Sequence, residues 1–291
     1  MTSQGITLPD GRTMGYEAYG AHEGPLVFAL HGTPTCSLAF ENFDKPASTL
    51  GIRVVAPDRP GIRSSSARPG YRVIDVAQDL VAAADALGME RFGVLGWSGG
   101  GPYALATADV ATDRLLGVVV AAGMGPLDSP HGASGYSSFD QQMLRWSRDR
   151  PWLARVSLGT MGFACRVAPG LIRSALSGDL SPRDKEVAEV ATRDQSSRMA
   201  MRFVSEAFRG GAGGVVADYA ALGSPWGFAL EDIRVRVYVW QGDDDRMVSP
   251  VHARAIVERA TTCELIECPG EGHMIVYSHA EEMLRQAAAL D

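Results

Sequence analysis

The chain has 291 residues, of which 46% are hydrophobic and 21% charged, a composition that supports a hydrophobic core and excludes a disordered or fibrous protein. Its net charge of -7, without a long run of like charges, argues against nucleic-acid binding. No apolar stretch is long enough to cross a bilayer, and the first residues lack the pattern of a signal peptide. We therefore expect a soluble, cytoplasmic protein without a membrane partner. Its four cysteines are too few and too scattered for a disulfide framework.

The chain begins with a predicted β-hairpin. Residues Ile6–Leu8 and Thr13–Tyr19 flank a Pro-Asp-Gly stretch, whose residue types favour a tight turn. After the hairpin, short apolar runs alternate with helical segments, and such continuous runs are typical of strands buried on both faces of a parallel sheet. The predicted strands are Leu26–Leu30, Arg53–Ala56, Phe92–Leu95, Leu116–Ala121, Val235–Trp240 and Glu264–Glu267.

Helices are predicted between several of these strands. Val73–Leu87 carries apolar residues at helical spacing and stops at Gly88, a residue that commonly follows a helix end. The alternation of strand and helix predicts an α/β fold with a mostly parallel, doubly wound sheet. The other predicted helices are Tyr103–Val110, Val251–Arg259 and His279–Leu290.

The alternation breaks between residues 127 and 230, where helical patterns occur without a convincing strand. We therefore predict a core formed by residues 1–126 and 231–291 and a helical cap, or lid, formed by residues 127–230. The cap is expected to cover the mouth of a pocket and to set substrate choice without contributing to the chemical step. One apolar stripe at helical spacing comprises Phe139, Met143 and Trp146.

A helix start is predicted inside the cap. Ser181-Pro182 followed by Asp184 combines a capping hydroxyl with a proline at the first helical position.

Ser98 is the candidate nucleophile. It lies in Gly96-Trp97-Ser98-Gly99-Gly100, between a predicted strand and a predicted helix. A nucleophilic serine needs its oxygen exposed on a strained turn, and small neighbours let the strand and the helix approach closely. The N-terminus of the following helix directs free N–H groups toward the reacting centre. In this setting the motif predicts a catalytic serine rather than a glycine-rich turn with an incidental serine.

His273 is the candidate general base, because histidine titrates in the range that a serine hydroxyl requires. It follows Gly272 in the loop between the last predicted strand and the last predicted helix, and such loops converge on the ligand site of an α/β sheet. His31 directly follows a strand and is interpreted as structural. The other histidines are interpreted as surface residues: His22, His131, His252 and His279.

Asp245 is the candidate third member, which would orient the imidazole and stabilise its charged form. It lies three residues past Gly242 and shortly before a predicted helix start. Asp243 and Asp244 are expected to form a solvated acidic turn. Asp128, after the preceding core strand, is the alternative. The chain order serine, aspartate, histidine is the order expected of this constellation.

Five short motifs support a family resemblance: His31-Gly32-Thr33-Pro34, Ala56–Gly61, Gly96–Gly100, Gly242–Asp245 and Gly272-His273. With them the chain resembles an α/β-hydrolase of the serine hydrolase or esterase type with an inserted helical cap, over essentially its whole length. The resemblance implies that the backbone N–H groups of Thr33 and Gly99 hold an oxyanion. Thr35 stands where the family often has a glycine, which affects the shape of this loop. The Asp58-Arg59 pair is expected to hold loops together rather than to take part in the chemistry.

The predicted activity is hydrolysis of a carboxylic ester or lactone of a fairly apolar small molecule through an acyl-enzyme, with neither cofactor nor metal. Ser98 attacks, His273 transfers the proton, and Asp245 fixes the imidazole. The resemblance disfavours a dehalogenase or an epoxide hydrolase, since those enzymes have an aspartate where this chain has Ser98.

Other reactions of the same fold remain open: C–C bond hydrolysis, prolyl aminopeptidase activity, cofactor-free peroxidase activity, cyanohydrin lysis and biosynthetic cyclisation. A ligand binder without hydrolytic activity is the alternative from another class. An aminopeptidase would need acids in the cap to bind the substrate amine, and Glu206 is the candidate. The residues predicted to line the substrate pocket are Met124, Trp146, Phe163 and Met274.

Overall fold

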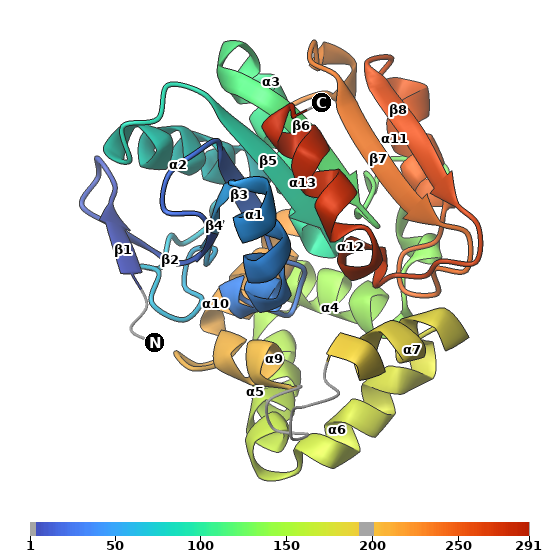
Figure 1. Cartoon of the computed structure of the whole chain (residues 1–291). Helices are drawn as coiled ribbons and strands as arrows, with labels where there is room; N and C mark the ends of the chain where they lie inside the picture. Colours follow the sequence, from blue (N-terminus) through green and yellow to red (C-terminus); the bar gives the residue numbers. More distant parts are fainter. Residues whose placement is uncertain (1–3, 192–200, 291) are drawn as a thin grey trace.

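The computed structural model describes residues 4–191 and 201–290. These residues form an eight-stranded sheet with the strand order β1-β2-β4-β3-β5-β6-β7-β8 (Figure 1). The hairpin β1-β2 and the pair β2-β4 are antiparallel, and all pairs from β4 to β8 are parallel. The predicted doubly wound α/β fold is therefore confirmed. The strands are β1 (Gln4–Thr7), β2 (Thr13–Gly20), β3 (Leu26–Leu30), β4 (Arg53–Pro57), β5 (Phe92–Trp97), β6 (Leu115–Ala121), β7 (Val237–Gly242) and β8 (Cys263–Cys268).

Helices cover both faces of the sheet (Figure 1). One face packs against α2 (Val73–Ala86), α3 (Gly101–Val110) and α11 (Val251–Arg259). The other face packs against α1 (Asp44–Leu50), α12 (Ile275–Ser278) and α13 (Ala280–Ala288). Short 3-10 helices are η1 (Ser37–Phe43), η2 (Ser98–Gly100), η3 (Thr112–Arg114), η4 (Gly132–Gly135), η5 (Ser177–Asp179) and η6 (Leu230–Asp232).

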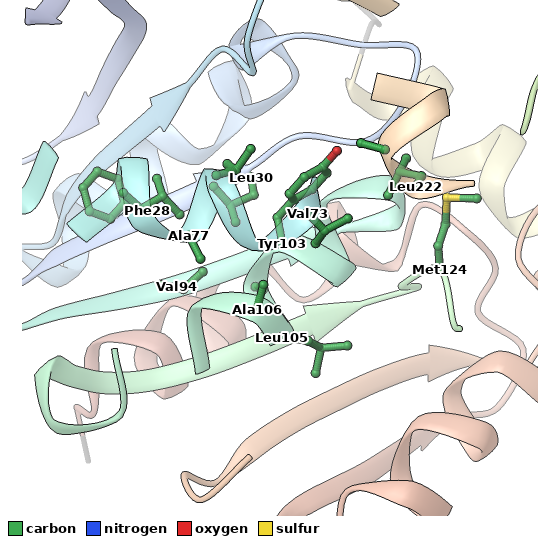
Figure 2. Close-up of a cluster of buried hydrophobic side chains, with 14 of the residues drawn as sticks. Phe28, Leu30, Val73, Ala77, Val94, Tyr103, Leu105, Ala106, Met124 and Leu222 are labelled. Carbon is green, nitrogen blue, oxygen red and sulfur yellow. The ribbon is translucent and has the colours of Figure 1, made fainter. Parts of the chain in front are cut away.

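Each central strand contributes to two hydrophobic cores, because successive side chains point to opposite faces. In β3, Phe28 and Leu30 belong to the core on the α2 and α3 side, whereas Val27 and Ala29 belong to the core on the α13 side. Figure 2 shows part of the first core, to which Phe28, Leu30 and Val94 of the sheet and Tyr103 of α3 all contribute. Double-sided burial explains why these strands are continuous apolar runs in the sequence.

The helices that lie between β6 and β7 along the chain fall in the predicted cap, and they are called the cap helices below. In Figure 1 they gather below the sheet, on the side where β7 and β8 end. Their position brings them over the loops that carry the candidate catalytic residues. The division into core and cap at residues 127 and 230 stays a prediction. The helices are α4 (Ser138–Asp149), α5 (Pro151–Val167), α6 (Pro169–Leu176), α7 (Pro182–Ala191), α9 (Arg202–Ala207) and α10 (Gly213–Leu222).

Several details differ from the sequence-based expectation. The 3-10 helix η1 and the helix α1 lie between β3 and β4, where no element was predicted, because each is only seven residues long and the segment has little helical periodicity. His252, expected at the surface, is fully buried.

All four cysteines are free thiols. Within residues 4–191 and 201–290, no helix is long and apolar enough to span a membrane.

Candidate active site

Ser98 lies at the sharp turn between β5 and α3. Its φ of 55° is in the left-handed region, which a non-glycine residue adopts only when the surrounding structure holds it there. Glycines on either side permit this turn: a methyl group at Gly96 would collide with the carbonyl group of Gly100, and one at Gly100 would collide with the carbonyl group of Leu30. Ser98 is nearly buried and lines a cavity. The local geometry is that of a sharp strand-to-helix turn, as expected of a nucleophilic serine.

His273 and Asp245 are joined by a hydrogen bond. The distance between His273 Nδ1 and Asp245 Oδ2 is 2.9 Å, and both side chains are buried. The other carboxylate oxygen of Asp245 accepts hydrogen bonds from the backbone N–H groups of Met247 and Val248, each at 2.9 Å. Gln241 Nε2 donates to Oδ2 at 3.2 Å. The carboxylate is therefore fixed in place, and it fixes the histidine ring in turn.

The environment of His273 favours its protonated form. Burial alone would lower its pKa, but the adjoining Asp245 carboxylate, with contributions from Asp184 and Asp140, outweighs burial and raises the pKa above the usual 6.5. Trp97 packs against the histidine. Its Nε1 donates a hydrogen bond to the backbone oxygen of His273 at 3.0 Å, and the two rings are in contact.

Thr33 and Gly99, the two predicted oxyanion donors, lie against each other. A Cβ atom at Gly99 would lie 3.2 Å from the backbone nitrogen of Thr33. Thr33 precedes a cis peptide bond to Pro34 and lines the same cavity as Ser98. The loop after β3 and the turn after β5 therefore meet beside the candidate nucleophile.

A buried ion pair holds the Thr33 loop. Arg59 Nε lies 2.7 Å from Asp218 Oδ1, and Arg59 Nη2 donates to the backbone oxygen of Gly32 at 3.0 Å and to Thr33 Oγ1 at 2.7 Å. Thr33 Oγ1 also donates to Asp218. The structure thus confirms that Arg59 holds loops together, as the sequence predicted. Burial would raise the pKa of Asp218, but Arg59 dominates and lowers it.

Asp218 contacts Thr33 and Arg59 beside the candidate active site, and it was not predicted from the sequence. It lies on the cap helix α10, is fully buried, and accepts a further hydrogen bond from the Tyr103 hydroxyl at 2.7 Å. No local sequence signal marks it, because an aspartate between Ala217 and Tyr219 in an apolar helix has no distinctive spacing. Only the fold reveals that this carboxylate faces Arg59.

The cavity has a volume of about 530 Å³ and lies between the core and the cap. Thr33, Ser98 and His273 line it from the core, together with Met274 as predicted. Most of the cavity's exposed wall is apolar, although charged side chains such as Asp140, Arg173 and Lys185 also line it. Several lining residues are large and apolar. They include Leu38, Phe139, Met161, Met201, Phe203 and Tyr277.

Three of the four residues predicted to line the pocket do not reach it. Met124 is buried in the hydrophobic core (Figure 2). Trp146 packs against the buried residues of the cap, two turns beyond Phe139, which does line the cavity. Phe163 is 64% exposed, because it lies roughly 200° around α5 from the cavity-lining Met161.

The alternative acidic residues lie in other environments. Asp128 pairs with Arg259 at 2.7 Å and is mostly exposed. Asp244 pairs with Arg246, and Asp243 accepts a hydrogen bond from a backbone N–H group in the loop before His273. Glu206 pairs with arginines and does not line the cavity, so it offers no support for binding a substrate amine.

Asp140 is the second buried acid that the sequence analysis missed. It lines the cavity at the start of α4 and accepts hydrogen bonds from Tyr219 and Ser137. Burial raises its pKa. In the part of the chain that the structure describes, no three His, Cys, Asp or Glu side chains are grouped as ligands for a metal ion.

Comparison with known proteins decides the family. The family model described as "alpha/beta hydrolase fold" matches residues 25–280. The chain belongs to the α/β-hydrolase family. The family-level prediction from the five motifs is therefore confirmed.

Relatives of this α/β-hydrolase have different reactions in their names. The present chain is 35% identical to epoxide hydrolase B of Mycobacterium tuberculosis over 100 residues, which are 33% of this chain and 28% of that protein. It is 26% identical to a haloalkane dehalogenase of Mesorhizobium japonicum over 284 residues, which are 95% of this chain and 87% of that protein. The aligned part of the first relative is thus less than a third of its length.

The fold is shared with solved structures. An esterase from Exiguobacterium antarcticum superposes with a TM-score of 0.67 at 17% identity, covering 99% of this chain and 98% of that one. At this identity the similarity concerns the fold alone. The reaction of this chain has to be argued from its own site.

Proposed function

We propose that this α/β-hydrolase is a serine hydrolase that cleaves a carboxylic ester or lactone of a fairly apolar small molecule. The observation that carries the proposal is the placement of Ser98 on a strained turn, in one cavity with His273, whose ring is held by Asp245. The cavity's apolar lining favours an apolar substrate. The proposal includes no cofactor, no metal, a small-molecule partner and a cytoplasmic location.

In the first half-reaction, Ser98 Oγ attacks the substrate carbonyl carbon. Asp245 engages Nδ1 of His273, which leaves Nε2 to accept the proton of the Ser98 hydroxyl. The tetrahedral oxyanion receives hydrogen bonds from the N–H groups of Thr33 and Gly99, each worth roughly 3 kcal/mol in the transition state. The carbon–oxygen bond to the alcohol then breaks, the His273 proton passes to the leaving alcohol, and an acyl-enzyme remains.

In the second half-reaction, water attacks the acyl carbon and gives its proton to His273. The same two N–H groups hold the second oxyanion. The bond to Ser98 Oγ breaks, Ser98 regains the proton from His273, and the carboxylic acid leaves. Because the imidazolium forms twice in each turnover, the carboxylates around His273 support both steps.

The epoxide hydrolase and dehalogenase names of two relatives imply attack at a saturated carbon, and Ser98 argues against that chemistry here. A carboxylate that displaces a leaving group from such a carbon forms an ester, which water can cleave at its carbonyl. A serine would form an ether, which has no carbonyl for water to attack. A serine nucleophile therefore favours substrates that already contain a carbonyl group.

The test is turnover of nitrophenyl esters by wild type and Ser98→Ala. Wild type should release a burst of nitrophenol equal to the enzyme concentration when deacylation is slower than acylation. Ser98→Ala should retain its melting temperature and lose about 10⁶-fold in kcat. Unchanged turnover in Ser98→Ala would contradict the proposal, and binding of the ester without any turnover by wild type would favour a ligand binder.

A further inference from the structure

Asp184 at the start of the cap helix α7 uses its two carboxylate oxygens for different tasks. Oδ2 accepts the backbone N–H of Ser181 at 3.2 Å, while Ser181 Oγ accepts the backbone N–H of Asp184 at 3.0 Å, which together form a capping box. Oδ1 accepts a hydrogen bond at 2.6 Å from the backbone N–H of Met274, which lies outside the helix. Met274 directly follows His273, so the cap is hydrogen-bonded to the histidine loop.

The histidine loop is shaped around this carboxylate. A methyl group at Gly272 would collide with the carboxylate of Asp184, so the loop approaches Asp184 more closely than any larger residue would allow. The neighbouring Arg183 of α7 pairs with Glu271 of the same loop at 3.2 Å. The start of α7 therefore contacts the loop on both sides of His273.

The charge around His273 comes from three elements. Asp245 follows β7, Asp140 lies on α4 and Asp184 lies on α7, and all three carboxylates favour the imidazolium. Glu271, in the histidine's own loop, instead faces Arg183, Ser278 and His279. Asp184 is only 1% exposed, so its field is weakly screened by solvent.

We propose that Asp184 is a positioning residue supplied by the cap: its hydrogen bond to Met274 fixes the histidine loop, and its buried charge stabilises the imidazolium of His273. This inference rests on the proposed function. It also revises the expectation that the cap leaves the chemical step untouched. A capping residue alone would account for the bonds to Ser181 but not for the bond to Met274.

The electrostatic part of the proposal is that the Asp184 charge stabilises the imidazolium of His273, and it is tested without any substrate. The measurement is an NMR titration of the His273 imidazole, whose signals are assigned by comparison with His273→Gln. Asp184→Asn removes the charge and keeps one amide oxygen, which can still accept the Met274 N–H while the bond from the Ser181 N–H is lost, so the pKa of His273 should fall. Glu186→Gln is the matched control, because this exposed acid of α7 pairs with Arg183 and should leave His273 unchanged. Equal His273 pKa values in wild type and Asp184→Asn would overturn this half.

The positioning half is tested by the pH profile of ester hydrolysis. The acid limb of kcat/KM in Asp184→Asn should move to lower pH together with the NMR titration, and kcat on the alkaline plateau should stay within about tenfold of wild type. Asp184→Ala removes the acceptor and should lower plateau kcat about 100-fold, below Asp184→Asn. Equal plateaus for the two variants would overturn positioning.

The variants also separate this inference from the proposed function. If wild type hydrolyses no ester, the proposed function fails, while the NMR titration still decides the charge effect of Asp184. If Asp184→Ala does not fold, the comparison of Asp184→Asn with wild type still confirms or overturns the shift of the acid limb.

Discussion

Three consecutive aspartates follow β7, and their hydrogen bonds separate their roles. Asp243 accepts the backbone N–H of Gly270, and Asp244 pairs with Arg246 near the surface. Asp245 alone of the three contacts the His273 ring. A carboxylate at this position keeps the imidazole in the tautomer that can accept a proton through Nε2.

We predict that Asp245→Asn lowers kcat by roughly 10⁴-fold, because an amide group would stabilise the wrong tautomer and could not balance the imidazolium. Asp243→Asn and Asp244→Asn should remain within about tenfold of wild type. The measurement is kcat on one nitrophenyl ester for all three variants, with melting temperatures to verify folding. An Asp245→Asn variant with nearly full activity would show that the acid has been misassigned.

The sequence could predict residues whose chemistry depends on a local motif. Ser98 and His273 lie in short glycine-containing turns whose spacing is distinctive. Pocket residues on cap helices were harder to predict, since an apolar stripe indicates that a helix is amphipathic but not which neighbour its apolar face meets. The predictions for Trp146 and Phe163 were wrong for this reason. Asp140 and Asp218 were missed because no local motif marks them and because Tyr219 and Arg59, which bind them, are distant in sequence.

At the scale of elements, α10 is joined to the core by the buried pair of Asp218 and Arg59. We predict that Asp218→Asn lowers the free energy of unfolding by about 3–5 kcal/mol, because it leaves the Arg59 guanidinium buried without a counter-charge. Glu267→Gln breaks the exposed pair with Arg254 and should cost less than about 1 kcal/mol. Urea unfolding of the two variants measures both values, and equal costs would refute a structural role for the buried pair.

The helix α5 presents one face to the cavity and another to solvent. Met161→Ala should alter the ranking of acyl-chain lengths, mainly through KM for long esters, because it removes contacts shared by the ground and transition states. Phe163→Ala, on the exposed face, should leave the ranking unchanged. Steady-state kinetics on short and long esters compare the two, and a change of ranking in Phe163→Ala alone would place the cavity wall elsewhere.

The core strands and the longer core helices were easier to predict than the short helices. Burial on both faces makes β3, β5, β6 and β7 continuous apolar runs, which the sequence reports directly. The α1 region was missed because a seven-residue helix leaves almost no periodic signal. The cap's helical character was visible, whereas its hydrogen bonds to the core were not, because they join residues more than 80 positions apart.

At the scale of the whole molecule, we expect a buried histidine to make the free energy of unfolding depend on pH. His252 stacks on Tyr136, and its two ring nitrogens are buried without a hydrogen-bond partner. Burial, with a smaller contribution from His131, lowers the pKa of His252 from 6.5 to about 4. In the unfolded chain the ring protonates near pH 6.5, so the unfolded state binds more protons between these values, and stability falls as pH falls.

We predict that the loss of stability between pH 7 and pH 4 is smaller in His252→Leu than in wild type, by up to about 3 kcal/mol. His31, whose pKa burial also lowers, acts in the same direction and is present in both proteins. The measurement is the free energy of unfolding in urea across this pH range. His22→Gln, at an exposed position, is the control, and an equal pH dependence in His252→Leu and wild type would contradict the prediction.

The most direct test of the serine hydrolase proposal is covalent labelling with an organophosphonate, followed by intact-protein mass and peptide mapping. Wild type should gain one adduct per chain, located on Ser98, in parallel with loss of ester hydrolysis. In the proposed mechanism His273 activates this hydroxyl, and the Thr33 and Gly99 N–H groups hold the phosphonyl oxygen. Ser98→Ala should gain none. Stoichiometric labelling of another residue, or full activity in a protein labelled on Ser98, would contradict the account.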